Sequence, residues 1–223
     1  MGKLIVLEGT DGVGKSTQFA RLKEALSAKG IPFTPAVFPR YSEPSSALIR
    51  MYLSGEFGTR PEDVNAYAAS LFYAVDRYAA FKKDWGDAYG AGELIVCDRY
   101  TTSNAVHQGG KVANQEEFFR WLYETEYGKM GLPAPDLVLY LEAPIEVTEK
   151  SMRKREAQTH TAADIHEKDL NYLRTCRETG LQAAEFYGWQ VIHCAANGAM
   201  RSIEDIHAEI MCHVAKCLEE AIW

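Results

Sequence analysis

Residues 9–17 combine glycines with a lysine and hydroxyl side chains at spacings suited to holding a polyphosphate. They fit the pattern G-x-x-x-x-G-K-[ST], in which glycines let the backbone curl so that several N–H groups converge on one anion. Lys15 would then reach the β- and γ-phosphates, and the Ser16 hydroxyl would be a ligand of Mg²⁺. The predicted ATP-binding loop consists of Gly9, Thr10, Asp11, Gly12, Val13, Gly14, Lys15, Ser16 and Thr17.

Other charged side chains follow short apolar runs. Arg40, Asp98 and Arg99 each stand just after such a run. An apolar run that closes on an aspartate is typical of the carboxylate that helps to hold Mg²⁺ in P-loop proteins, so Asp98 joins Ser16 as a candidate metal ligand. Because ligands of open parallel sheets bind at the carboxyl ends of the strands, we expect these groups to share one crevice with the glycine loop.

Further arginines indicate the second substrate. Arg77 lies on the flank of a long predicted helix, and Arg153 and Arg155 lie just before a predicted break. A hydroxyl acceptor would call for a carboxylate base, whereas a phosphate monoester is already an anion at neutral pH and needs its charge neutralised. Guanidinium groups can hold two phosphates during in-line transfer, which favours a nucleoside monophosphate kinase. The catalytic candidates are Lys15, Arg99, Asp11, Arg153 and Arg155.

Composition and charge narrow the class of protein. The chain has 223 residues, 47% hydrophobic and 25% charged, as expected of one globular domain. Its net charge of −7 argues against bulk nucleic-acid binding, since such proteins present basic faces. We expect a cytoplasmic protein for three reasons. The five cysteines lack metal-ligand spacing, the sequence has no long apolar run, and we see no leader.

Apolar runs alternate with segments of helical periodicity, which predicts an α/β fold with a parallel sheet covered by helices on both faces. The first strand is expected to begin at Leu4, and the others are expected over residues 33–38, 94–97, 137–141 and 190–194. Helices are expected after the glycine loop and over residues 44–53, 61–83, 101–108, 116–127 and 166–187. One more is expected to begin at residue 144, and another around 203–218. Residues 86–92 are expected to form a loop.

Four motifs in this order resemble those of the thymidylate kinases. They are residues 8–17, 38–41, 71–77 and 98–104, and the resemblance covers essentially the whole chain. It implies a P-loop nucleoside monophosphate kinase fold and the Mg²⁺-dependent transfer of the ATP γ-phosphoryl group to dTMP, giving dTDP for dTTP synthesis. It also implies a homodimer, and one kinase domain over residues 1–223 with a small lid at about 150–166.

The resemblance also assigns roles on the acceptor side. Tyr73 stands where the family places a ring stacked on thymine, and Arg77 would bond the edge of the base. Arg40 and Arg99 would hold the acceptor phosphate, and an arginine of the lid would be catalytic. The implied dTMP-binding set is Asp11, Phe38, Arg40, Tyr73, Arg77, Arg99, Asn104 and His107, with Asp11 near the 3′-hydroxyl and the metal, Phe38 beside the base, and Asn104 and His107 bordering the sugar.

Two positions depart from the commoner family residues. His107 stands where many members have tyrosine, and Tyr73 replaces phenylalanine. Three alternatives stay open. One is a deoxynucleoside kinase or another P-loop kinase of a related pyrimidine, and another is a nucleotide-binding module without catalysis. The third, a GTPase-type switch, would need an N-K-x-D segment, and the sequence has none.

Overall fold

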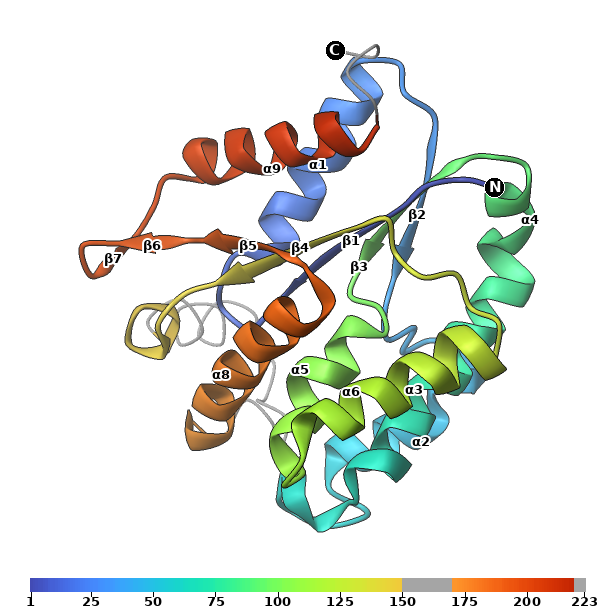
Figure 1. Ribbon diagram of the computed structural model, residues 1–223, viewed down its shortest axis with the longest axis vertical. Helices are drawn as coiled ribbons and strands as arrows, with labels where there is room; N and C mark the ends of the chain where they lie inside the picture. The colour runs from blue at the N-terminus through green and yellow to red at the C-terminus, as the bar shows by residue number, and fades with distance from the viewer. Residues whose placement is uncertain (150–169, 219–223) are drawn as a thin grey trace.

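The computed structural model describes residues 1–149 and 170–218, which fold around one parallel sheet (Figure 1). Its strands are β1 (Leu4–Gly9), β2 (Phe33–Val37), β3 (Leu94–Asp98), β4 (Leu137–Glu142) and β5 (Gln190–His193). They lie in the order β2-β3-β1-β4-β5, and each neighbouring pair is parallel. The predicted α/β class and five-stranded parallel sheet are confirmed.

Helices α1 (Lys15–Ala28) and α9 (Ile203–Cys217) cover one face of the sheet (Figure 1). Alternation along β1 explains the two layers, because successive side chains of a strand point to opposite faces. Ile5 belongs to the core beneath α1 and α9, whereas Val6 belongs to the core on the other face. Both side chains are fully buried, and each contributes about 1.5–3 kcal/mol to folding.

Four further helices lie on the other side of the sheet (Figure 1). They are α3 (Ala66–Ala80), α5 (Thr102–Gln108), α6 (Gln115–Tyr123) and α8 (Leu170–Tyr187). Helix α2 (Ala47–Ser54) follows a 3₁₀ turn at Pro44–Ser46 and packs against α3. Residues 145–149 are also helical, in agreement with a helix from residue 144.

The helix predicted over residues 61–83 begins later and continues further than expected. It starts at Ala66, where the Asn65 side chain accepts hydrogen bonds from the first N–H groups and caps the helix. At its other end it widens into a π-helical turn, Phe81–Trp85, and continues as α4 (Gly86–Gly90). The loop predicted at residues 86–92 is therefore wrong over residues 86–90.

Gly86 explains that error. A Cβ at this position would lie 2.3 Å from the carbonyl oxygen of Phe81, so only glycine fits the close approach in this turn. Trp85, which is buried against the rings of Phe81, Tyr89 and Tyr100, holds the turn against the core. Tertiary packing therefore overrides the low helix propensity of glycine.

Two further features lie outside the predicted pattern. A second π-helical turn, Glu124–Lys129, extends α6 beyond its predicted end. A short antiparallel hairpin of β6 (Ala195–Ala196) and β7 (Ala199–Met200) follows β5. Its turn residues, Asn197 and Gly198, both have positive φ, as the tight two-residue hairpin turn requires.

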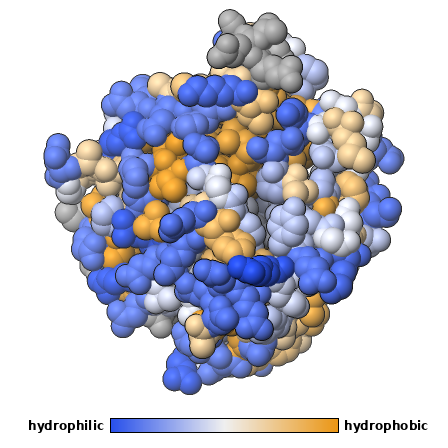
Figure 2. All heavy atoms as spheres, in the orientation of Figure 1, coloured by the Kyte–Doolittle hydropathy of each residue, from blue (hydrophilic) through white to orange (hydrophobic). Residues whose placement is uncertain are grey.

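Hydrophilic residues cover most of the face drawn in Figure 2, and hydrophobic ones reach the surface in patches near its middle. On α3, the large apolar side chains of Leu71, Val75 and Tyr78 are 40–48% exposed. Within the described ranges, no helix is both long and apolar enough to cross a lipid bilayer.

Candidate active site

The segment between β1 and α1 forms a hollow of about 240 Å³ beyond the carboxyl end of β1. Gly12 and Gly14 have φ of 78° and 90°, a left-handed conformation that favours glycine. A Cβ on Gly9 would lie 2.5 Å from the carbonyl oxygen of Leu141. Val13 is buried and does not line the hollow. The hollow is lined by Thr10, Asp11, Gly12, Gly14, Lys15, Ser16 and Thr17.

The hollow lies at the N-terminus of α1. Gly14 is the N-cap residue and has no side chain to cap the helix. The N–H groups of the first turn, on Lys15, Ser16 and Thr17, therefore lie beside the hollow at the positive end of the helix dipole. This is the arrangement that binds phosphate groups at helix N-termini.

Lys15, which lines the hollow, lies beside Asp98, which lines neither the hollow nor the neighbouring cavity. The Lys15 Nζ atom is 2.6 Å from Oδ1 of Asp98, and both residues are buried. Burial lowers the pKa of Lys15, and the positive charge of Arg99 lowers it further, while Asp98 opposes both effects. The Ser16 hydroxyl, the other candidate metal ligand, is exposed.

Arg99 is the centre of a buried charge cluster. Its Nη2 donates to Oδ1 of Asp11 at 2.8 Å, and its Nη1 donates to Oε1 of Glu8 at 3.3 Å. Burial alone would lower the pKa of Arg99, but Asp11 and Glu8 raise it above its usual value, so the guanidinium stays charged. Its φ is 66°, a conformation that non-glycine residues rarely adopt, and strained backbone of this kind clusters at active sites.

Glu8 fixes the position of this cluster and is a residue that sequence reasoning did not select. It is fully buried and accepts hydrogen bonds from the Thr102 hydroxyl at 2.7 Å and the Ser103 hydroxyl at 2.6 Å. Its position as the only charged residue of the buried strand β1 was the available signal, because a buried carboxylate must be paired.

His107 stands behind Arg99 as a neutral side chain. Its Nε2 accepts from Nη1 of Arg99 at 3.1 Å, and its Nδ1 lies 3.6 Å from the sulfur of Cys176. Burial, reinforced by the charge of Arg99, lowers the pKa of His107 to about 4. At neutral pH this histidine therefore accepts a hydrogen bond and carries no charge.

A second cavity, of about 150 Å³, adjoins the hollow, since Asp11 lines both. It brings together the predicted residues Asp11, Phe38, Tyr73, Arg77, Arg99, Asn104 and His107. It is also lined by six residues to which the sequence analysis assigned no site role: Pro39, Tyr41, Leu53, Tyr100, Ser103 and Gln108. Both side-chain amide atoms of Gln108 are buried without a hydrogen-bond partner in the described part of the chain. Such an amide is suited to a polar ligand in the cavity.

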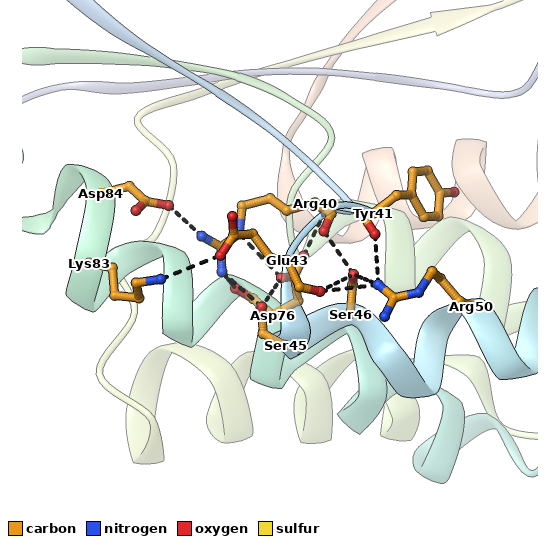
Figure 3. Close-up of polar contacts among 9 residues, drawn as sticks. All are labelled: Arg40, Tyr41, Glu43, Ser45, Ser46, Arg50, Asp76, Lys83 and Asp84. Carbon is orange, nitrogen blue, oxygen red and sulfur yellow. Dashed lines mark hydrogen bonds and ion pairs between the residues drawn. The ribbon is translucent and has the colours of Figure 1, made fainter.

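Of the residues predicted to bind the phosphoryl acceptor, only Arg40 does not line this cavity. Its guanidinium is held by carboxylates from α3 and the first π-helical turn (Figure 3). The Nε atom lies 3.2 Å from Oδ1 of Asp76, Nη1 contacts the Asp84 carboxylate, and Nη2 donates to the Ser45 hydroxyl at 3.0 Å. The structure thus brings Arg99, but not Arg40, to the cavity wall.

The lid arginines, Arg153 and Arg155, and the predicted lid at 150–166 lie outside the described residues, as does the start of the helix predicted over 166–187. Among the described residues, the hollow and the cavity that share Asp11 form a crevice with two compartments. One is suited to a polyphosphate, and the other combines aromatic rings with arginines.

Comparison with known proteins agrees with this geometry. The family model described as thymidylate kinase matches residues 7–210. The chain is 31% identical over 192 residues to a thymidylate kinase of Mycobacterium tuberculosis, a match covering 83% of this chain and 87% of that one. It is 30% identical over 210 residues to a probable thymidylate kinase of Pyrococcus horikoshii, covering 94% of each. A thymidylate kinase of Desulfotalea psychrophila is 32% identical over 170 residues, covering 75% of this chain and 78% of the relative.

Proposed function

The chain belongs to the thymidylate kinase family, and from this membership we propose how its residues transfer the γ-phosphoryl group of ATP to dTMP, giving dTDP for dTTP synthesis. The observation that carries the proposal is the shared wall of the two compartments, where Asp11 and Arg99 meet. A donor in the hollow and an acceptor in the cavity would face each other there. A deoxynucleoside kinase is not favoured, because the relatives are thymidylate kinases.

The glycine loop is the ATP site. The backbone N–H groups of residues 9–17 surround the phosphates, and Lys15 exchanges its contact with Asp98 for the β- and γ-phosphates. Because the pKa of Lys15 is lowered by burial and by Arg99, arrival of phosphate anions also restores a favourable environment for its charge.

The charge balance of the crevice supports a requirement for Mg²⁺. Three carboxylates, on Glu8, Asp11 and Asp98, face two cations, Lys15 and Arg99. A phosphate monoester adds a charge of about −1.5 to −2, and the ATP phosphates add more, so further positive charge is needed. The Ser16 hydroxyl and the Asp98 carboxylate are oxygen donors of the kind that hold Mg²⁺ together with substrate phosphates. When bound, Mg²⁺ supplies charge neutralisation of the transferred group.

The cavity is the dTMP site. The ring of Tyr73 stacks on thymine, Phe38 packs beside it, and Arg77 bonds the base edge. Asn104 and Gln108 supply further polar contacts, and Arg99 holds the acceptor phosphate. Arg40 reaches that phosphate only by leaving Asp84, which is its exposed partner.

Transfer itself needs positioning rather than a base. The acceptor phosphate is already ionised at neutral pH, so the site has to reduce repulsion between two anions and hold them in line. Arg99 and Lys15 do this from the described residues, and Arg153 and Arg155 complete the cationic set from the lid at about 150–166. The chain acts as one kinase domain over residues 1–223.

The exposed stripe on α3 is the surface for a second copy of the chain. Leu71, Val75 and Tyr78 are spaced four and three residues apart, which places them on one side of the helix. Three large apolar side chains together on one helix face are suited to an isologous contact in a homodimer. A cytoplasmic location is supported by the five cysteines, all free thiols, as expected in a reducing compartment.

Measurement of ADP release with purified full-length protein, ATP and Mg²⁺ tests the function. We expect turnover with dTMP and none with thymidine, because the site neutralises a phosphate and has no base assigned to a hydroxyl. Turnover with thymidine alone would indicate a deoxynucleoside kinase. ATP binding without turnover on any monophosphate would indicate a binding module.

A further inference from the structure

Glu126 lies behind the cavity and contacts several residues of its wall. It belongs to the π-helical turn Glu124–Lys129 and is fully buried. It accepts two hydrogen bonds from Arg77, at 2.6 Å each, one from the Thr101 hydroxyl at 2.9 Å and one from the Asn104 amide at 3.0 Å. Glu126 does not line the cavity, so any effect on a ligand is transmitted by these partners.

The two contacts with Glu126 fix how Arg77 faces the cavity. Its Nε and Nη2 atoms are bound to the two carboxylate oxygens, in the bidentate geometry that holds a guanidinium plane in one orientation. The Nη1 atom is left to donate to the carbonyl oxygen of Tyr100, at 3.3 Å, and to the cavity. Burial would lower the pKa of Arg77, but Glu126 raises it. Arg77 is therefore a fixed donor.

The orientation of the Asn104 side-chain amide is also fixed. Its Nδ2 atom donates both to the backbone carbonyl of Ser70 at 3.0 Å and to Glu126 at 3.0 Å. Rotating the amide by half a turn would place its carbonyl oxygen against a carbonyl and a carboxylate, two acceptors that cannot donate. The side-chain carbonyl is therefore the group that Asn104 can offer to a ligand, and Asn104 is a fixed acceptor.

A donor and an acceptor held next to each other by one carboxylate can read a base edge. Thymine and uracil present an acceptor at O4 beside a donor at N3–H, whereas cytosine presents a donor at N4 beside an acceptor at N3. We propose that Glu126 is the positioning residue that makes the cavity select the thymine-type edge over the cytosine-type edge. This inference rests on the proposed placement of the base against Arg77, and it assigns Asn104 to the base edge instead of the sugar, where the family resemblance had placed it.

Gln108 provides a contrast within the same cavity. No partner among the described residues fixes its amide, which can therefore turn either its carbonyl or its NH₂ group to the ligand. Gln108 can strengthen binding of either base without choosing between them, so selection is assigned to the residues that Glu126 orients.

The test compares dTMP with dCMP in Glu126→Gln. A glutamine at this position turns one acceptor into a donor, which opposes a donor of Arg77 or Asn104. Rotation of the Asn104 amide relieves the conflict at residue 126 by presenting NH₂ to the cavity, with loss of its hydrogen bond to the Ser70 carbonyl. We expect the ratio of kcat/KM for dTMP to that for dCMP to fall on the order of tenfold, through KM more than kcat. The matched control is Glu124→Gln in the same turn, whose side chain is 67% exposed and which should leave the ratio unchanged.

A second variant covers a failure of Glu126→Gln to fold. Thr101→Val removes one hydrogen bond to Glu126 but keeps the charge pair with Arg77, so the ratio should shift in the same direction by a smaller factor, on the order of threefold. Gln108→Ala should weaken both substrates together.

Dissociation constants for dTMP and dCMP, measured by calorimetry on the same variants, separate this inference from the proposed function. Wild-type protein that binds dTMP but does not turn it over would defeat the function and leave the binding ratio to be measured. An unchanged ratio in folded Glu126→Gln, or in Thr101→Val if the former does not fold, would overturn the inference.

Discussion

The guanidinium of Arg99 lies 2.8 Å from the carboxylate of Asp11, and this contact joins the end of β3 to the glycine loop. It links two segments that are 88 residues apart in sequence and places a charged fork where the two compartments meet. An acceptor phosphate entering the cavity would compete with Asp11 and Glu8 for the same donors. Arg99 is therefore the residue whose removal should affect turnover most directly.

Replacing Arg99 with alanine should lower kcat by about 10²–10³-fold, because one preorganised group that stabilises transferred charge is lost. The measurement is ADP release at saturating ATP and dTMP. Arg21→Ala is the matched control, since it removes an arginine that is paired with Glu204 and lines neither the hollow nor the cavity. Wild-type turnover in Arg99→Ala would show that its assigned role is wrong.

Replacing Tyr73 with alanine should raise the KM for dTMP with a smaller change in kcat. Loss of base stacking costs about 1–3 kcal/mol, or roughly 5- to 150-fold in affinity. Tyr73→Phe keeps the ring and should bind dTMP nearly as well as the wild type. Equal KM values for the alanine variant and the wild type would exclude stacking at this position.

Protonation of His107 should make the protein less stable below about pH 6.5. The pKa of this histidine is about 4 in the folded protein and 6.5 when unperturbed, so between these values the unfolded chain binds more protons. The free energy of unfolding should therefore fall as the pH falls through this window, by at most about 3 kcal/mol at pH 4. Urea denaturation from pH 4 to 7.5 would measure the slope.

Two histidine variants separate this effect from general acid denaturation. His107→Gln should flatten the pH dependence of stability in that window, and His213→Gln, which replaces a histidine on α9 outside the cluster around Arg99, is the comparison variant. Identical slopes for all three proteins would contradict a depressed pKa at His107.

The two carboxylates that hold Arg40 should differ in their contribution to stability. Asp76 is buried and also accepts from the backbone N–H of Arg40 and the Ser45 hydroxyl, so Asp76→Asn should cost about 2–3 kcal/mol. Asp84 has a side chain that is 49% exposed, so Asp84→Asn should cost less than about 1 kcal/mol. Equilibrium urea unfolding measures both, and equal losses would be inconsistent with this difference in burial.

An arginine in place of Val75 should convert a dimer to a monomer. A charge in the centre of the stripe formed by Leu71, Val75 and Tyr78 would have to be desolvated on association. Light scattering coupled to size-exclusion chromatography gives the mass. Ile203→Arg, at an exposed apolar position on α9, is the control and should keep the wild-type mass. A Val75→Arg protein with an unchanged dimer mass would place the interface elsewhere.

The central strands of the sheet, β1, β3 and β4, were predictable because they are buried on both faces. Strands covered by helices become continuous apolar runs, and such runs stand out at residues 94–97 and 137–141. The segment around Gly86 was not predictable in this way. Its glycine resembles a helix breaker, yet the close approach to Phe81 requires that residue. The hairpin at Asn197 and Gly198 carried a usable signal, because that dipeptide is typical of tight hairpin turns.

The donor side of the site was easier to predict than the residues that support the acceptor side. The glycine loop is local, so spacing alone identifies it. Glu126 pairs with a residue 49 positions away, from a π-helical turn that breaks helical periodicity. For Arg40, the sequence predicts its place at the end of β2 but not its ion pair with Asp76, because that pair depends on tertiary contacts.

At position 99, the left-handed backbone favours glycine, whereas the charge cluster requires arginine. A glycine there would adopt a φ of 66° easily, whereas arginine does so at an expense of about 1–3 kcal/mol. Only arginine, however, brings the charged fork to Asp11. Selection for thermal stability alone would tend to replace this arginine and yield a stable but inactive protein. Directed evolution of this enzyme should therefore select for activity and thermal stability together.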